Sequence, residues 1–442
     1  MCMPQVLCLL LLPLSEQPPE FKLIRYEEGW SNQRSNSLKN IPMESRGMYL
    51  TIGGETRQRY EYFRNPVWGL DPGDGNGYLL QRYMLHADLH LGSRLRVFSQ
   101  MKSGIESGRI GDPRPPDRDE LDVHQAFVEV KSPGSAIQLR AGRQEISLGS
   151  SRLVGIREGP NVRQSFDGGR LSGESTHWRV DLLAIRPAET NPGKFDDSIG
   201  HRQSFWGAYA TAKRRRWGSA DLYYLGLDRK NHEFDQGAAR EQRHSAGVRW
   251  YDKVGAWDFD YEGLWQFGTF GSSQIRAWTV ASNSGYTLES LALRPRIGLK
   301  ADIASGDRNP LDRRLGTFNA LYPKGAYFSE ADLLGPYNIM DLHPSVTVPI
   351  SRGVSVSADA DYFWRQSTRD GIYDMPGNLI VSGQEARSRY IGAHANVMLE
   401  WEATRHLSFT ANYLHFVPGP FLREVGLGHA VDFVGLWATF KF

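Results

Sequence analysis

Cysteine is almost missing from this chain of 442 residues. Cys2 and Cys8 are the only two, and both lie within the first eight positions. If the N-terminal stretch that carries them is removed, no thiol remains. A disulfide framework and a cysteine-based zinc site are therefore excluded.

Long hydrophobic runs and an excess of one charge are also missing. Mean hydropathy is −0.47, and the sequence predicts no helical membrane span beyond its N-terminus. The 52 basic side chains are balanced by 50 acidic ones, which leaves a net charge of +2. Nucleic-acid binding would favour a clear basic excess, so the charge balance gives no support for that class of partner.

Aromatic residues and glycine are plentiful and spread along the whole chain. Aromatic residues make up 12% of the sequence, and there are 46 glycines. No Pro/Ser-rich linker divides the chain into two different halves. This mixture is typical of many short strands with glycine turns, and it fits a helical enzyme less well.

The N-terminus carries an apolar run, Val6–Leu14, of the length of a signal-peptide core and too short to span a bilayer. No Lys or Arg precedes it, and no small-x-small cleavage motif follows it. We predict that residues 1–20 are an export signal with a wrongly assigned or truncated start; a disordered apolar tail is the alternative. Residues 21–47 are then a periplasmic N-terminal segment, and residues 48–442 form the folded body.

Alternation of apolar and polar residues with period two is the strongest pattern in the sequence. In Val354–Trp364 the even positions are apolar or aromatic, and the odd positions are serine, aspartate and phenylalanine. Trp257–Phe267 and Ile391–Trp401 alternate in the same way. A half-solvated sheet of a water-soluble protein would show this too. Aromatic residues gather at the strand ends, however, as in the girdles of a membrane barrel.

The lengths of the connections sharpen this prediction. Short turns alternate with long loops, which is the periplasmic and exterior asymmetry of a transmembrane antiparallel β-barrel in the bacterial outer membrane. An even number of strands places both ends on the short-turn side. The eighteen predicted strands are 48–64, 78–91, 94–105, 121–131, 136–145, 165–173, 176–186, 203–214, 217–228, 242–251, 256–267, 274–282, 291–303, 337–348, 353–366, 387–402, 405–416 and 430–442. The long loops include 106–120, 146–164, 188–202, 229–241, 304–336, 367–386 and 417–429.

Several stretches resemble the alginate-export family of outer-membrane porins. They are Phe21–Glu28, Leu50–Tyr60, Gly142–Glu145, Gly149–Leu153, Asn161–Arg163, Phe166–Gly168, Pro295–Thr317 with Ala304–Arg308 inside it, and Asn338–Pro344. The resemblance implies a channel for passive export of an alginate-like anionic polysaccharide. Its expected partners are outer-membrane lipid, lipopolysaccharide and a periplasmic export component, and we expect a monomer. Uptake of small anionic organic solutes is the alternative, and a barrel with a plugged lumen that acts as an adhesin or scaffold is a third possibility.

If the apolar strand faces meet lipid, the polar faces line the lumen. Guanidinium and ammonium groups along such a path attract anions, and repeated weak sites let a polyanion move on. Opposite charges that merely brace the interior are the other interpretation. The predicted lumen cations are Arg82, Arg96, Lys102, Arg140, Arg249, Arg294, Arg296, Lys300 and Arg365, with Asp258, Asp260 and Glu262 as acidic partners.

Four more arginines lie near the long loop after the fifth predicted strand: Arg143, Arg152, Arg157 and Arg163. A loop with so many arginines could fold inward as a constriction. It could equally bind the phosphates of surface lipopolysaccharide.

Motifs for catalysis are missing. His86, Asp88 and His90 share one strand face, but an ordinary polar lining explains them better than a metal does. There is no Gly-x-Ser-x-Gly elbow and no His-Glu-x-x-His helix. The glycines of Gly69–Gly77 lack the strand-loop-helix context of a phosphate cradle. We therefore expect no enzymatic activity, no catalytic residue, no cofactor and no metal.

Overall fold

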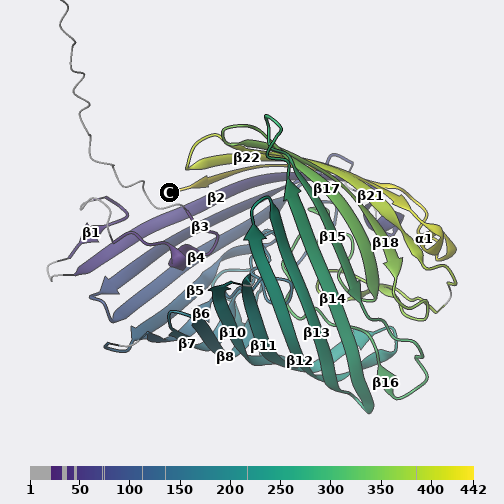
Figure 1. Cartoon of the computed structure of the whole chain (residues 1–442), viewed down its shortest axis with the longest axis horizontal. Helices are drawn as coiled ribbons and strands as arrows, with labels where there is room; N and C mark the ends of the chain where they lie inside the picture. Colours follow the sequence, from purple (N-terminus) through teal and green to yellow (C-terminus); the bar gives the residue numbers. More distant parts are fainter. Residues whose placement is uncertain are drawn as a thin grey trace, which may run out of the picture.

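The fold is seen in a computed structural model (Figure 1), which describes residues 21–31, 37–43 and 47–442 apart from the single positions 72, 74, 112, 135, 217 and 385. The predicted export signal, residues 1–20, lies outside the described residues. In the described part of the chain, no helix is long and apolar enough to cross a membrane.

Eighteen antiparallel strands close into a single barrel. The first strand pairs with the last, so that Glu55 lies opposite Lys441 and Arg64 lies opposite Asp432. The wall strands are β2 (Met48–Arg64), β3 (Tyr78–Leu91), β4 (Leu95–Ser107), β5 (Asp119–Lys131), β6 (Ile137–Gln144), β7 (Phe166–Glu174), β8 (Trp178–Glu189), β10 (Gln203–Arg215), β11 (Gly218–Phe234), β12 (Gly237–Val254), β13 (Trp257–Phe270), β14 (Ser273–Thr287), β15 (Arg296–Ala304), β17 (Ile339–Ser351), β18 (Val354–Arg365), β21 (Tyr390–Glu402), β22 (Leu407–Pro418) and β23 (Val431–Lys441).

Short elements lie in the connections between these strands. They are β1 (Ile41–Pro42), β9 (Ser198–Ile199), β16 (Arg314–Leu315), β19 (Ile372–Tyr373), β20 (Leu379–Val381), α1 (Pro420–Glu424) and the 3-10 turns η1 (Arg25–Glu27) and η2 (Pro66–Gly69).

Each of the eighteen predicted strands is present, but the predicted loop 229–241 is wrong. Strand β11 continues to Phe234 and β12 begins at Gly237, so only residues 235–236 remain between them. Figure 1 shows β12, β13 and β14 as long arrows. A strand that extends beyond the bilayer no longer needs an apolar outer face, so the hydrophobic alternation ends while the hydrogen-bond ladder goes on.

The alternation has the orientation that a membrane barrel requires. On β13 the side chains of Trp257 and Trp265 are 57% and 48% exposed on the outside of the barrel. Glu262 on the opposite face of the same strand is 6% exposed. Lipid faces the aromatic and aliphatic side, and the charged side is enclosed by the wall.

Two long loops fold into the barrel and pair with each other. Val154 of the 145–165 loop forms a parallel bridge to Tyr322 of the 305–338 loop, and the Gly155 N–H donates to the Tyr322 carbonyl over 2.8 Å. The Tyr322 ring packs edge-on against Phe166 and Phe205 at 5.2 and 5.4 Å between centroids. The main hydrophobic core is therefore built between the loops and the inner wall.

Part of the predicted N-terminal segment also enters the barrel, at the end that carries the short turns. Tyr26 is 3% exposed, packs edge-on against Phe98 and Phe127, and donates its hydroxyl to the Glu145 carbonyl over 2.7 Å. Arg25 donates to a backbone carbonyl on β2 and to one just after β23. Residues 21–31 thus occupy part of the bore.

Candidate functional site

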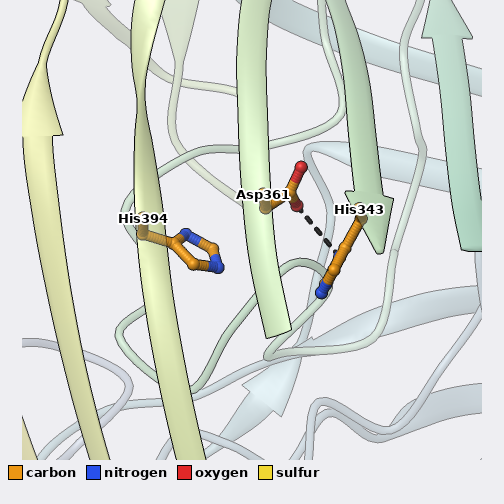
Figure 2. A group of neighbouring side chains, drawn as sticks. All are labelled: His343, Asp361 and His394. Atoms are coloured by element: carbon orange, nitrogen blue, oxygen red, sulfur yellow. Dashed lines mark ion pairs between the residues drawn. The ribbon is translucent and has the colours of Figure 1, made fainter. Parts of the chain in front are cut away.

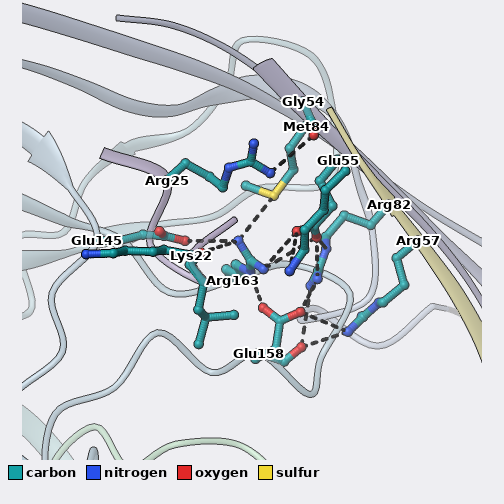
Figure 3. Close-up of polar contacts among 12 residues, drawn as sticks. Lys22, Arg25, Gly54, Glu55, Arg57, Arg82, Met84, Glu145, Glu158 and Arg163 are labelled. Carbon is teal, nitrogen blue, oxygen red and sulfur yellow. Dashed lines mark hydrogen bonds and ion pairs between the residues drawn. The ribbon is translucent and has the colours of Figure 1, made fainter. Parts of the chain in front are cut away.

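A buried network of opposite charges holds the 145–165 loop against the inner wall. We call Glu55, Arg57, Arg82, Glu158 and Arg163 the Arg163 cluster (Figure 3). Arg82 lies 2.8 Å from Glu55, and Arg163 lies 3.4 Å from the same carboxylate. Both arginines also pair with Glu158 of the loop. Each buried charge in this cluster therefore has an opposite charge beside it.

Strand register explains why the cluster needs the loop. Period-two alternation places Arg57 on the inner face of β2 and Arg82 on the inner face of β3, and the two residues are direct partners across the strands. Two neighbouring cations would repel each other without a carboxylate between them. Glu158 supplies one. Burial alone would raise the pKa of Glu158, but Arg163 and Arg82 outweigh burial and hold the pKa at about 2.

Beside this cluster lies a cavity of about 690 Å³, between the ends of β2 to β4 and the inward loops. Its lining mixes charges of both signs. The arginines are Arg59, Arg109, Arg114, Arg157 and Arg163, and the carboxylates are Glu61, Asp71, Asp117, Glu330, Asp332 and Asp374.

Most of these arginines are neutralised by a neighbour, but Arg157 is not. Arg59 lies 2.5 Å from Glu61, and Arg114 lies 2.7 Å from Asp117. Among the described residues, no carboxylate lies within 4 Å of the Arg157 guanidinium, and its Nε is buried without a hydrogen-bond acceptor. Arg157 also has a φ of 54°, a left-handed backbone conformation that is costly for a non-glycine residue. The loop thus holds one arginine in the cavity that makes no ion pair within 4 Å among the described residues.

Of the nine predicted lumen cations, eight lie on the inner wall, and most are already paired. Arg365 instead donates to five backbone carbonyls and anchors the 366–389 loop. Lys300 donates to the Tyr327 carbonyl over 2.9 Å and lies 3.8 Å from the Asp302 carboxylate. The ion pairs of the others are Arg82–Glu55, Arg96–Asp88, Lys102–Asp119, Arg140–Glu129, Arg249–Asp260 and Arg296–Asp258. The third predicted acid, Glu262, accepts from the Tyr223 hydroxyl over 2.7 Å.

Arg294 is the exception, and its prediction as a lumen residue is wrong. Strand β14 ends at Thr287 and β15 begins only at Arg296, so Arg294 lies in the turn. Its side chain is 61% exposed and pairs with Glu289 over 2.9 Å. Leu291 and Leu293 stand at alternate positions and so imitate a strand, but both are exposed in this turn.

The four arginines predicted near the constriction loop are distributed over different places. Arg143 lies on β6 itself and pairs with Asp167 over 2.9 Å, so it does not belong to the loop. Arg152 reaches Asp302 of the wall over 3.5 Å. Arg163 belongs to the cluster and Arg157 to the cavity. The loop does fold inward, and Arg152 and Arg163 tie it to the wall.

Three arginines that line the cavity were not predicted from the sequence: Arg59, Arg109 and Arg114. Arg59 alternates in step with Glu55 and Arg57 along β2, so the strand pattern contained the signal for it. Arg109 and Arg114 lie beyond the end of β4, where no periodicity indicates a direction.

Comparison with known proteins gives a family and a fold. Residues 48–434 match the family described as alginate export. No curated protein matches the sequence. Solved outer-membrane proteins of Pseudomonas aeruginosa have a similar fold. OccK11 (OpdR) is 13% identical, with 89% of this chain and 96% of that chain covered and a TM-score of 0.58.

OccK5 (OpdH) is 12% identical, with 89% and 98% of the two chains covered and a TM-score of 0.59. OpdK with vanillate is also 12% identical, with 88% and 98% covered and a TM-score of 0.56. Identities this low show the fold alone, and the family and fold are those of channels, which are not enzymes. The chain belongs to the alginate export family and is an outer-membrane β-barrel channel for solutes.

Proposed function

We propose that the channel conducts carboxylate-bearing anions and that its cargo is an alginate-like polyuronate, exported passively. The observation that carries this proposal is Arg157. A guanidinium group presents a fork of donors that matches a carboxylate, and it stays charged at every physiological pH. Because Arg157 has no acidic neighbour of its own within 4 Å among the described residues, a passing carboxylate need not displace one.

Lys324 offers a second unpaired cation close to the first loop. Its backbone N–H donates to the Ser151 carbonyl over 2.9 Å, so the side chain stands where the 145–165 and 305–338 loops meet. It is exposed, and within the described chain no carboxylate pairs with it. A few weak sites of this kind attract a polyanion without trapping it, which is what conduction requires. Membership of the alginate export family supports the same class of cargo.

Uptake of small anionic solutes is the second candidate. A cavity of about 690 Å³ has the size of a small-molecule site. Two inward loops and residues 21–31 also narrow the bore. One of the similar structures, OpdK, contains vanillate.

Planar-bilayer recording of the purified full-length protein separates the two candidates. Polyuronate and the corresponding monomeric uronate are added in turn to wild type, Arg157→Gln and Arg294→Gln. We expect polyuronate to block the current of wild type and of Arg294→Gln, which loses the same charge outside the bore. Arg157→Gln should need at least about tenfold more polyuronate, because a charge-assisted hydrogen bond contributes about 1.5–3 kcal/mol and every 1.4 kcal/mol is tenfold.

Two results would contradict this proposal, the first for the polymer and the second for the role of Arg157. Block by the monomer but not by polyuronate would favour uptake of small anions. An unchanged blocking concentration in Arg157→Gln would remove Arg157 from the conduction path.

A further inference from the structure

Three adjacent strands bring two histidines and several aspartates together on the inner wall. His343 lies on β17, Asp361 on β18 and His394 on β21, and Figure 2 shows the three side chains directed toward one another. One potential ligand atom from each lies within 4.8 Å of the others. Asp341 and Asp359 belong to the same inner faces of β17 and β18. We call these five residues the His343 cluster.

The aspartates of the cluster are largely buried and lie away from the lysines and arginines of the described chain. Asp361 is fully buried, and neither of its carboxylate oxygens accepts a hydrogen bond. Asp341 is 5% exposed and is likewise without a donor. Among the described residues, no lysine or arginine lies within 4 Å of Asp341, Asp359 or Asp361. Buried carboxylates without a lysine, an arginine or sufficient donors are costly, and a bound cation would relieve this cost.

A second acidic group in the wall shows the contrast. Asp119, Asp122 and Asp197 also lie close enough together to hold an ion. There, however, the Lys102 ammonium lies 2.6 Å from Asp119 and 2.7 Å from Asp197. That group contains a lysine, whereas the His343 cluster has only its two histidines beside the aspartates.

We propose that His343, Asp361 and His394 bind one divalent transition-metal ion, for which Zn²⁺ is the best fit. Two imidazoles and a carboxylate are ligands that Zn²⁺ prefers, with bonds of about 2.0–2.2 Å, so that neighbouring ligand atoms lie about 3.4 Å apart. His343 Nδ1 is already 3.0 Å from Asp361 Oδ2. Asp359 Oδ1 lies 3.0 Å from His343 Nε2, on the other side of the ring, and would accept a hydrogen bond from that nitrogen and fix the orientation of the imidazole.

The position of the site suggests what the ion does. His394 packs against Phe363 at 5.5 Å between ring centroids, and Phe363 packs edge-on against Phe328 of the 305–338 loop at 5.2 Å. A bound ion would join three strands under this loop and would neutralise the acidic patch on the wall. Metal binding would therefore stabilise the barrel, and this effect is independent of the cargo.

Zinc binding is measured on tag-free, full-length protein refolded from inclusion bodies, so that neither a polyhistidine tag nor lipopolysaccharide competes for the metal. After treatment with EDTA and its removal, isothermal titration with Zn²⁺ should give one tight site per chain. His343→Gln and His394→Gln should each weaken binding about a hundredfold, since even second-shell changes cost 10–100-fold. The matched control is His244→Gln, which removes a histidine that stacks on Phe267, outside the cluster.

Two further readouts keep the proposal testable. Zn²⁺ should raise the unfolding temperature of wild type and of His244→Gln, and it should leave that of the cluster variants unchanged. If a histidine variant does not fold, Asp361→Asn replaces it, and bound Co²⁺ should give the visible absorption of a nitrogen-ligated site only in wild type.

Either of two outcomes overturns the proposal. The first is no stoichiometric Zn²⁺ binding to wild type, which would leave His343 as a protonated bridge between Asp359 and Asp361. The second is binding that survives both histidine substitutions. Neither outcome bears on polyuronate conduction, which is measured separately.

Discussion

The Arg163 cluster and the His343 cluster lie on the inner wall of the same barrel, yet they satisfy their charges differently. In the Arg163 cluster, Glu158 from a loop is placed between arginines of the wall and of the loop itself. At the His343 cluster, the neighbouring loop contributes Phe328 instead of a cation. The inner face of every strand must be polar, so each wall segment has charges to neutralise. The difference shows that the loops decide which of these charges stay available for ions.

The largest expected effect comes from removing one charge of the Arg163 cluster, in which every charge has an opposite charge beside it. Arg163→Met leaves the buried Glu55 and the half-buried Glu158 beside fewer cations, and breaking a buried ion pair on one side costs about 3–5 kcal/mol. The free energy of unfolding in denaturant should fall by that amount. Arg294→Met, which removes an exposed turn arginine, should leave it unchanged. A loss below about 1 kcal/mol would mean that water reaches the cluster and that the pairs are worth no more than surface ones.

A smaller effect is expected from pH in the cavity beside the Arg163 cluster. Burial raises the pKa of Asp332 to about 7, against the ordinary value near 4. Asp332 is therefore largely neutral at pH 6 and charged at pH 8, and anion preference should be higher at pH 6. One charge about 10 Å from a passing ion in water is worth roughly 0.4 kcal/mol, or about twofold in the permeability ratio.

The raised pKa of Asp332 also predicts how the stability of the protein depends on pH. Because the folded-state pKa of this acid is raised, ionisation disfavours the folded state, and stability is lost as pH rises from about 4 through 7. Asp332→Asn should lose both the pH dependence of selectivity and this part of the pH dependence of stability. A wild-type permeability ratio that is the same at pH 6 and pH 8 would contradict the prediction.

The smallest expected effect is a change in anion preference on charge reversal at Arg296, compared with the same substitution at Arg294. Arg296 pairs with Asp258 over 2.5 Å on the inner wall, while Arg294 lies in the turn. Arg296→Glu places two carboxylates together near the mouth and should lower anion preference by less than about twofold at 0.15 M salt, where exposed charges are screened. Arg294→Glu should change nothing measurable in reversal-potential recordings. Equal effects of the two substitutions would place Arg294 back near the conduction path.

Much of the fold could be predicted because a barrel wall obeys local rules. Alternation on β18 places Asp359 and Asp361 on one face and Tyr362 on the other. The sequence alone predicts these two faces, because the rule is local. The rule fails where alternation continues without a strand, as at Leu291 and Leu293. It also fails where a strand continues without apolar alternation, as at β11 and β12.

The sites could be predicted only in part because they depend on contacts between distant segments. Arg157 lies in a loop without periodicity, and its isolation follows from where the neighbouring carboxylates are, which only the folded chain shows. His343, Asp361 and His394 each lie on a recognisable polar face. The three side chains come together because of the register of three strands, and the alternation alone does not determine that register.

The contacts of Arg25 have a consequence for how this barrel forms. Its guanidinium donates to the carbonyls of Gly54 and Phe442, so it bridges the seam between the first and last wall strands. Arg25 and Phe442 are 417 residues apart, and pairing over such a separation is entropically late in folding. These hydrogen bonds of Arg25 can form only after the barrel has closed. They therefore slow opening of the seam without speeding its formation, and they contribute to the lifetime of the native barrel.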